Sequence, residues 1–356
     1  MIYIIALLFS ILFCRLSEDQ KGKYQRIFLY CLSAVPLTYL SAFRYKVGTD
    51  YIETYWKSFS YIKYGQEING YDFLMTKLCQ FILLFTDAHI VLFAVSSMLI
   101  GFFVYKSIYD QSVNKKYSIL LYVITGLYFM SLNQVKQFIG MSICLFSVKW
   151  FFEKKYFLFG LCMASASLFH NACIVFVLPF LLSLIPNIYK YIAPKIVIVG
   201  LGVFYFFRLL FFEKIFIALL SYTRFYDRYV DSSYSEGDFS IASFIFDSII
   251  LVFYMYAYKT EKNNGEFLVF YLAKIVTMLL IILSDVMSIT PRIADTFFII
   301  DIIAIPYLIK TIHNRKVKLL ANYSIIGVLL IYFYWSFFIL NNHNPFPYRS
   351  YFSGLY

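Results

Sequence analysis

Long apolar runs alternate with short polar segments along the whole chain. Twelve of these runs approach the roughly 20 residues that a transmembrane helix needs. They cover residues 2–14, 24–43, 88–107, 117–133, 134–152, 156–170, 171–186, 194–212, 239–259, 266–284, 292–312 and 318–340. The pattern predicts an all-α, polytopic membrane helical bundle of about 12 transmembrane helices that forms a single domain over residues 1–356.

A further apolar segment at residues 72–86 is short and cannot be placed by length alone. Lys and Arg are enriched in the short cytoplasmic loops of membrane proteins. The four loops richest in these residues are 15–26, 106–116, 149–155 and 310–318. They share one side of the membrane only if an odd number of spans separates residues 44 and 106, so residues 72–86 are expected to form an interfacial or re-entrant helix on the outer side. The same count places both termini outside and gives external loops at 44–87 and 213–238.

Composition supports membrane insertion and argues against a soluble domain. Hydrophobic residues make up 61% of the chain and charged residues 14%, whereas charged residues make up about 25% of soluble domains. The formal net charge is +11, but the 31 basic residues are scattered between apolar runs. We attribute this distribution of basic residues to membrane topology, in which Lys and Arg mark cytoplasmic loops, and we expect no nucleic-acid binding. The six cysteines show no CxxC motif and no pairing with histidine, so neither a disulfide framework nor a zinc site is indicated.

The unusual polar segments all fall on the external side of this predicted topology. They are residues 43–55 (FRYKVGTDYIETY), 133–137, 169–171, 221–238, 284–292 and 341–352. Ionisable groups that converge near a membrane indicate a functional site. The chain contains no GxxxxGK[ST] loop, which argues against an ATP-driven machine.

Four basic residues in these segments have two interpretations each. Arg44 and Lys46 can be interfacial anchors that extend toward the aqueous phase. Arg224 and Arg228 stand four residues apart and can be neutralised by acidic residues of the same helix. For these four residues the structural interpretation and the anion-binding interpretation both stay open.

Two further candidates lie next to predicted helix ends. His170 ends a short span beside Asn171, and a lone histidine can also be a packing residue. Arg292 directly follows Pro291 at the start of a predicted helix, where unpaired N–H groups and the helix dipole favour anions. We therefore favour an anion-binding role for Arg292.

The segment FRYKVGTDYIETY resembles the R-Y-x-x-G-x-D-Y-x-x-Y signature of the EpsG-like family of bacterial polysaccharide polymerases, which are related in role to the Wzy polymerases of O-antigen and capsule synthesis. Three later segments also resemble the family pattern, namely NQVKQFIGMSICLF at 133–146, ASLFHNACIVFVLP at 166–179 and PRIADTFF at 291–298. Lys136 stands where the family usually has arginine, and Gly140 where alanine is common. A lysine keeps the positive charge but loses the bidentate fork of arginine.

The resemblance implies glycosyl transfer at the outer leaflet of the bacterial plasma membrane, in the synthesis of O-antigen, capsule or exopolysaccharide. A glycan on undecaprenyl diphosphate, or another polyprenyl diphosphate, would be transferred to the non-reducing sugar hydroxyl of a second lipid-linked repeat unit. The implied partners are these lipid-linked oligosaccharides, membrane lipid, and other assembly proteins such as a flippase and a chain-length regulator. No soluble cofactor is expected, and the absence of a D-x-D motif indicates catalysis without a metal.

The same resemblance suggests roles for individual residues. The attacking hydroxyl needs a general base, for which Asp50 and His170 are the catalytic candidates, with Asp50 favoured because it belongs to the most specific motif. Cationic side chains would stabilise the leaving diphosphate. The residues expected to bind diphosphate or glycan are Arg44, Lys46, Tyr51, Lys136, Gln137, Arg224, Arg228, Arg292 and Arg349.

Two other classes of protein stay open. A transporter or flippase of lipid-linked oligosaccharide would have inverted repeats and polar residues along a path through the bilayer. The other class is a non-catalytic scaffold, or a ligase or acyltransferase that acts on the same lipid-linked glycan. The chain has no H-x-x-x-D or H-D pair, which argues against acyl transfer, whereas a glycan ligase would use the same donor and much of the same chemistry.

Three acidic or basic residues lie deep inside predicted spans. Asp247, Lys274 and Asp301 are each about 12 to 15 Å from the external end of their span, at 1.5 Å per residue. Unpaired charges at this depth are costly, so we predict that Lys274 pairs with Asp247 or Asp301. The alternative is that the three residues line a path for protons or substrate.

Overall fold

The computed structural model describes residues 1–66, 72–208, 241–284 and 290–353. Within these residues it contains 17 α-helices and no β-strand, which confirms the all-α prediction. Five helical stretches are long and apolar enough to cross a membrane by length and composition. They are Ile90–Gln111, Val135–Phe152, Ile241–Glu261, Gly265–Ile282 and Arg315–Ile339. The chain is therefore a membrane protein of helical type, and the count of twelve spans stays a prediction.

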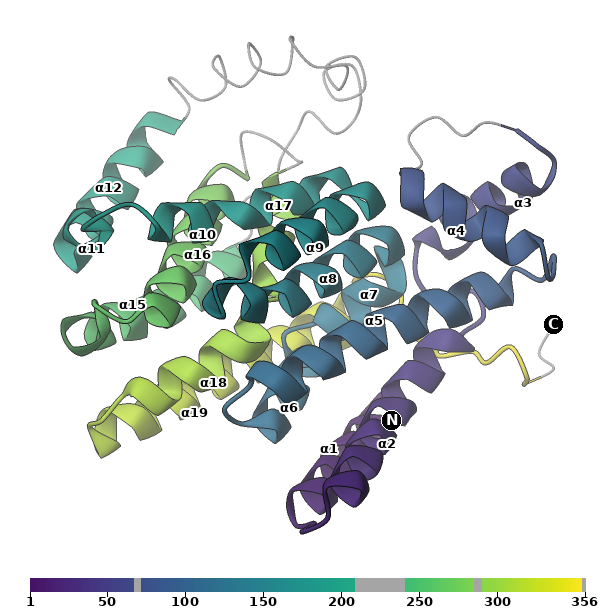
Figure 1. Ribbon diagram of the computed structural model, residues 1–356, viewed down its shortest axis with the longest axis horizontal. Helices are drawn as coiled ribbons and strands as arrows, with labels where there is room; N and C mark the ends of the chain where they lie inside the picture. Colours follow the sequence, from purple (N-terminus) through teal and green to yellow (C-terminus); the bar gives the residue numbers. More distant parts are fainter. Residues whose placement is uncertain (67–71, 209–240, 285–289, 354–356) are drawn as a thin grey trace. The chain divides into compact units, whose positions relative to one another are not determined.

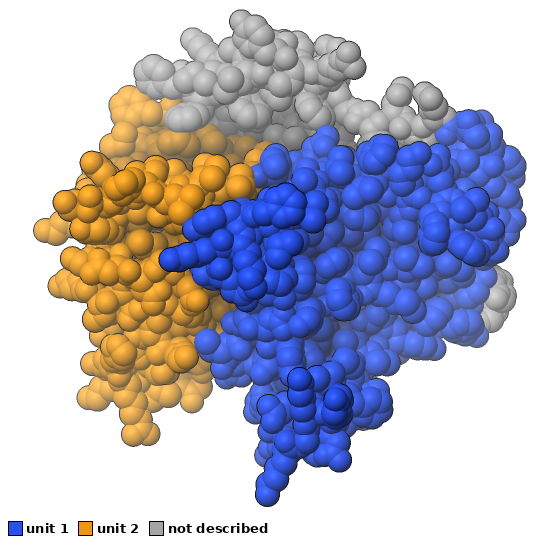
Figure 2. Space-filling view, in the orientation of Figure 1, with its two compact units in different colours: residues 1–174, 329–356 blue, residues 175–328 orange. Residues whose placement is uncertain are grey.

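The chain divides into two compact units, which Figure 2 distinguishes by colour. Unit 1 comprises residues 1–174 and 329–356, and unit 2 comprises residues 175–328. The single domain predicted for residues 1–356 stays a prediction.

Unit 1 is built from helices that pack on one another in succession. Helix α1 packs on α2, α2 on α5, α5 on α8, and α8 on α9 (Figure 1). The helices and helical turns that lie wholly in this unit are α1 Ile2–Glu18, α2 Lys23–Ala42, η1 Tyr51–Trp56, α3 Lys57–Lys63, α4 Phe73–Leu83, α5 Ile90–Gln111, α6 Lys115–Ile124, α7 Leu127–Asn133, α8 Val135–Phe152, α9 Tyr156–Phe169 and η4 Tyr334–Ile339.

The predicted span at 117–133 is wrong as one continuous helix. Gly126 adopts a left-handed conformation with φ of +86° and separates α6 from α7. A Cβ atom at this position would lie 2.6 Å from the Phe337 ring, so the aromatic ring packs where only glycine leaves room. The break follows from a tertiary contact with a residue more than 200 positions away, which the local pattern does not reveal.

The segment predicted to be interfacial or re-entrant forms the short helix α4. At 1.5 Å per residue its 11 residues extend about 16 Å, roughly half of the hydrocarbon thickness of a bilayer. Helix α4 packs on α3, α5 and α9. It is therefore too short to cross a membrane, and its interfacial placement stays a prediction.

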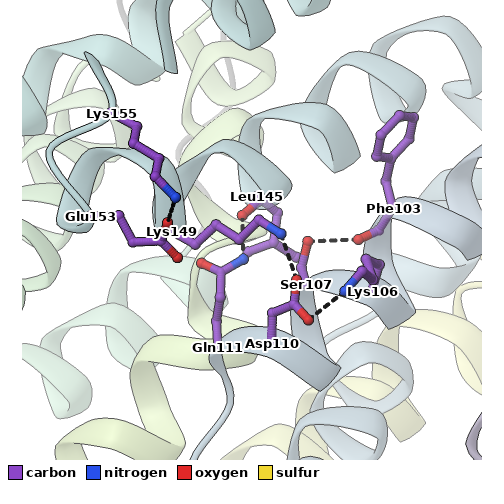
Figure 3. Close-up of polar contacts among 9 residues, drawn as sticks. All are labelled: Phe103, Lys106, Ser107, Asp110, Gln111, Leu145, Lys149, Glu153 and Lys155. Atoms are coloured by element: carbon purple, nitrogen blue, oxygen red, sulfur yellow. Dashed lines mark hydrogen bonds and ion pairs between the residues drawn. The ribbon is translucent and has the colours of Figure 1, made fainter. Parts of the chain in front are cut away.

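One end of unit 1 gathers lysines from the ends of α5, α6 and α8, as Figure 3 shows for Lys106 and Lys149. The Nζ atoms of Lys106 and Lys149 each lie 2.6 Å from a carboxylate oxygen of Asp110 (Figure 3). Lys116 lies 2.8 Å from Glu18, which joins the start of α6 to the end of α1. The basic loops 15–26, 106–116 and 149–155 thus share one end of unit 1, as the topology prediction requires, and the membrane side that this end faces stays a prediction.

Unit 2 is organised around α16. Helices α10, α12, α15 and α17 all pack on α16, and α18 packs on α15 and α17. The helices wholly in this unit are α10 Leu178–Ser183, α11 Ile188–Tyr191, α12 Pro194–Phe207, α15 Ile241–Glu261, α16 Gly265–Ile282, α17 Thr290–Phe298 and α18 Asp301–Thr311. Two elements extend over the boundary with unit 1, namely η2 Asn171–Val177 and α19 Arg315–Phe333.

The prediction of one helix over 292–312 is also wrong, because the chain leaves helical geometry at residues 299–300 and Asp301 begins α18.

The predicted pairing of Lys274 is confirmed. Its Nζ atom lies 2.5 Å from Asp247 Oδ1 and 2.6 Å from Asp301 Oδ2, so it binds both candidates.

Candidate functional site

Arg44, the second residue of the motif FRYKVGTDYIETY, lies in the interior of unit 1 with 1% of its surface exposed. Its guanidinium group donates to the carbonyl oxygens of Ser41, of Val47 at 3.3 Å, and of Leu132 at 3.0 Å. It also lies over the Phe93 ring, 4.7 Å from the ring centroid. These contacts fix the end of α2 to the end of α7, so the geometry favours a positioning role, while direct binding of diphosphate by Arg44 stays a prediction.

The next residues of the motif dock on the same end of α7. Gly48 has a φ of +99°, and a Cβ atom there would lie 2.6 Å from the Leu132 carbonyl oxygen. Asn133 Oδ1 accepts hydrogen bonds from the Asp50 backbone N–H at 2.8 Å and from the Thr49 hydroxyl at 2.5 Å. The glycine and the asparagine together explain why the chain reverses here and holds Asp50 at the start of η1.

The C-terminal segment of unit 1 covers the motif loop. Tyr45 N–H donates to the Arg349 carbonyl at 2.9 Å, and Tyr351 N–H donates to the Phe43 carbonyl at 2.8 Å. His343 Nδ1 lies 3.2 Å from Asn133 Nδ2. Because a backbone N–H must donate to Asn133 Oδ1, the amide nitrogen is the donor toward His343. Segments from opposite ends of the sequence therefore form one loop cluster.

A titratable cluster lies where three helices begin or end. Asp72 Oδ2 lies 2.8 Å from Lys136 Nζ and 3.3 Å from His170 Nδ1. Asp72 precedes the first residue of α4, Lys136 is in the first turn of α8, and His170 follows the last residue of α9. The side chains are 12%, 19% and 24% exposed in that order, so the cluster is partly accessible to solvent.

Electrostatics keep the Asp72 carboxyl group ionised. Burial alone raises the pKa of Asp72, but the hydrogen bond to His170 and the charge of Lys136 lower it by more, so its pKa lies below the ordinary value of 3.8. An ionised carboxylate beside Nδ1 of His170 accepts a hydrogen bond from the N–H of that ring nitrogen. In this tautomer Nε2 carries the free lone pair and can accept a proton. This arrangement of carboxylate and histidine is typical of a general base that a second residue orients.

Residues 133–137 connect the cluster to the motif loop. Asn133 binds the motif loop, and Lys136 binds Asp72 three residues later. The Lys136 backbone N–H also donates to the Tyr55 hydroxyl at 3.2 Å. Tyr55 belongs to η1, so the short turn at the start of α8 holds both parts of the site together.

Comparison with known families decides the class of the chain. The EpsG family matches residues 27–350, which is nearly the whole chain. The chain belongs to the EpsG family. No curated protein and no solved structure shows significant similarity to it. Membership in the EpsG family makes the chain a membrane protein associated with polysaccharide biosynthesis.

The structure gives a packing reason for one departure from the EpsG-family pattern. A Cβ atom at Gly140 would lie 2.6 Å from Cys173 Sγ and 2.9 Å from the Ala166 carbonyl oxygen. Here α8 and α9 approach too closely for the alanine that is common in the family. The close approach also brings the start of α8, with Lys136, toward the end of α9, with His170.

The other predicted site residues of unit 1 fall into a buried group and an exposed group. Tyr51 is fully buried and stacks on Phe93 with ring centroids 4.0 Å apart, and Gln137 is 4% exposed within α8. Lys46 and Arg349 are exposed at the motif loop and the C-terminal segment. Among the described residues of this EpsG-family protein, these two cations are the more accessible candidates for an anionic ligand.

Three basic candidates lie outside unit 1 or outside the described residues. Arg292 is exposed in α17 of unit 2, next to Pro291 as predicted. Arg224 and Arg228 lie outside the described residues, as does the predicted external loop 213–238. Their roles stay predictions.

Sequence analysis missed three residues that the structure places beside the motif loop or in the titratable cluster of unit 1. They are Asp72, which binds Lys136 and His170, His343, which contacts Asn133, and His89, which stacks on Trp56 with ring centroids 4.1 Å apart. For His89 and Asp72 the available signal was their place before apolar helices, which is also the place of ordinary capping residues. Their partners are distant in sequence, so spacing alone could not select them.

Proposed function

We propose that the chain is a membrane glycosyltransferase that joins polyprenyl-diphosphate-linked oligosaccharide repeat units into O-antigen, capsule or exopolysaccharide at the outer leaflet of the bacterial plasma membrane. The observation that carries the proposal is the cluster of Asp72, Lys136 and His170, which combines an orienting carboxylate, a cation and a histidine base at a partly exposed point. The family of the chain supports the substrate class.

In the proposed reaction, a sugar hydroxyl oxygen of the acceptor attacks C1 of the donor glycan. The new glycosidic C1–O bond forms while the bond between C1 and the phosphate oxygen breaks. The electron pair of that bond leaves with polyprenyl diphosphate. The hydroxyl proton moves to Nε2 of His170, and the carboxylate of Asp72 stabilises the resulting imidazolium.

His170 is a better candidate for the base than Asp50 on geometric grounds. A base needs a defined orientation toward the hydroxyl, and His170 has Asp72 on its opposite ring nitrogen. The Asp50 backbone is held by Asn133, which suits a role in shaping the acceptor site. We therefore assign the base to His170 and keep Asp50 as a substrate-positioning residue.

The leaving diphosphate needs positive charge, because one further negative charge develops on its terminal phosphate as the C1–O bond breaks. We assign this role in unit 1 to Lys136 together with the exposed Lys46 and Arg349. For Arg292 of unit 2, binding of a diphosphate stays a prediction. Protein partners of the proposed reaction are a flippase that delivers the lipid-linked units and a chain-length regulator.

The direct test measures polymer formation by the purified protein in lipid vesicles supplied with lipid-linked repeat units. His170→Ala should lower the turnover rate by about 10²- to 10⁴-fold, the usual contribution of a general base. His313→Ala, an exposed histidine of unit 2, is the matched control and should keep the wild-type rate. A wild-type rate for well-folded His170→Ala protein would remove this histidine from the mechanism. The same assay ranks Lys46, Arg292 and Arg349.

Deletion of the gene in its host separates the proposed polymerase from its alternatives. Loss of a polymerase leaves single repeat units on the lipid carrier at the outer surface. Loss of a flippase traps those units inside, and loss of a ligase leaves long chains that are not attached to their final acceptor. Either of the last two results would replace the proposed function.

A further inference from the structure

Unit 2 contains a charged cluster that the proposed reaction does not use. Lys274 of α16 binds Asp247 of α15 and Asp301 of α18 at 2.5 and 2.6 Å. The side chains of all three residues are at most 2% exposed. Around Lys274 Nζ the surroundings are apolar, with the ring centroids of Phe246 and Phe298 at 5.9 and 5.5 Å.

The charges of this cluster do not balance. Two carboxylates and one ammonium group sum to −1 when all three are ionised. An uncompensated charge in the interior is costly, and a buried acid usually takes up a proton instead. The cluster is therefore neutral only if one carboxyl group carries a proton.

The hydrogen bonds of the cluster indicate which carboxyl oxygen carries the proton. Lys274 occupies Asp247 Oδ1 and Asp301 Oδ2. Asp247 Oδ2 is buried and has no hydrogen-bond partner among the described residues. The hydroxyl groups of Tyr254 on α15 and Tyr271 on α16 are also buried without a partner in this part of the chain, and their rings stack with centroids 5.9 Å apart.

Charged groups on neighbouring helices do not change the net charge of the cluster. The groups that act on the Asp247 carboxylate are Lys274 and Asp301. Helices α12 and α17 also pack on α16, and their charged residues are Lys195, Arg292 and Asp295. The ammonium group of Lys274 already occupies the position between the two carboxylates that a metal cation would need. A proton is the ligand that needs no coordination shell.

We propose that Asp247, Lys274 and Asp301 form a proton-binding site in unit 2 that holds one exchangeable proton on the Asp247 carboxyl group. With the proton bound, the cluster is neutral and joins α15, α16 and α18. Without it, a net negative charge lies in the interior and loosens the same three helices. The folded state then binds more protons than the unfolded state near neutral pH, so stability falls as pH rises.

Infrared spectroscopy of the purified protein in lipid vesicles tests the site directly. The carbonyl stretch of a protonated carboxylic acid should be present at neutral pH, should decrease as pH rises, and should be absent in Asp247→Asn. Asp110→Asn is the matched control, because Asp110 of unit 1 is held as a carboxylate by two lysines and contributes no such band. Asparagine resembles the protonated acid in shape and charge, so Asp247→Asn should also unfold at a temperature that no longer depends on pH in this range.

Three results would overturn the proposal. The first is a wild-type spectrum without a protonated carboxyl band at any pH at which the protein is folded. The second is a band that survives in Asp247→Asn, which would place the proton on another group. The third is wild-type protein whose unfolding temperature is unchanged as pH rises. The wild-type measurements decide the matter even if Asp247→Asn does not fold, and none of these readouts depends on polysaccharide synthesis.

Discussion

Lys136 in unit 1 and Lys274 in unit 2 both bind aspartate side chains, but their surroundings differ. Lys136 is 19% exposed and shares Asp72 with His170. Lys274 is 2% exposed and lies between the buried carboxyl groups of Asp247 and Asp301. An ion pair near solvent contributes little to stability and can exchange partners with a ligand, whereas a buried pair becomes costly once one partner is removed. Exposure, more than residue type, thus separates a pair suited to binding substrate from one that holds helices together.

The largest expected effect comes from exchanging each lysine for methionine. Lys274→Met should lower the free energy of unfolding by about 3–5 kcal/mol, because it leaves the buried Asp301 carboxylate without a cation. Lys136→Met should lower it by less than about 1 kcal/mol and should instead reduce polymer formation per folded molecule. Chemical denaturation and the vesicle assay measure the two effects.

The matched control for this comparison is Lys77→Met, which removes an exposed lysine of α4. It should change neither stability nor activity. Equal stability losses for Lys136→Met and Lys274→Met would break the contrast between the two units.

A smaller effect is expected at the motif loop. Gly48→Ala introduces a side chain at a φ of +99° and within 2.6 Å of a backbone oxygen. Strain of this kind costs about 1–3 kcal/mol, so the variant should have a lower unfolding temperature and a displaced Asp50. Gly65→Ala is a suitable control, because its φ is also positive but no atom lies within 4 Å of the added carbon. If both variants lose the same free energy of unfolding, the close approach of the added carbon to Leu132 does not contribute to the loss.

The smallest expected effect is a dependence of stability on pH in the acidic range. The pKa of Asp72 is lowered in the folded state, so its ionised form stabilises the protein above the ordinary value of 3.8, and that contribution is lost as pH falls through and below this value. Asp72→Asn should remove this part of the pH dependence in a series of unfolding temperatures. Asp87→Asn, an exposed aspartate paired with Lys63, serves as the comparison. An unchanged acid profile in Asp72→Asn would mean that the cluster does not hold the carboxylate ionised.

The local sequence pattern was sufficient to predict most helical segments and one buried ion-pair cluster. Apolar runs predicted helical segments, and the cost of buried charge predicted the partners of Lys274. The break at Gly126 was missed, because a long apolar run has no local signal for a turn at which a distant ring packs. The break at residues 299–300 was also missed. Asp72 and His343 were missed for a related reason, since their partners lie 98 and 210 positions away. His170 and Lys136 were selected from motifs, but only the fold brings them to the same carboxylate.

The contact between the motif loop and residues 343–351 has a consequence for biosynthesis. The hydrogen bonds that cover the loop come from residues made about 300 positions after it. Proteins generally fold during synthesis from the N-terminus onward, so most of the helices can insert before this loop cluster is complete. A chain that stops before residue 343 would be inserted in the membrane with an unfinished site. The loop cluster therefore becomes complete only after residues 343–351 have been made, although the motif loop itself is made much earlier.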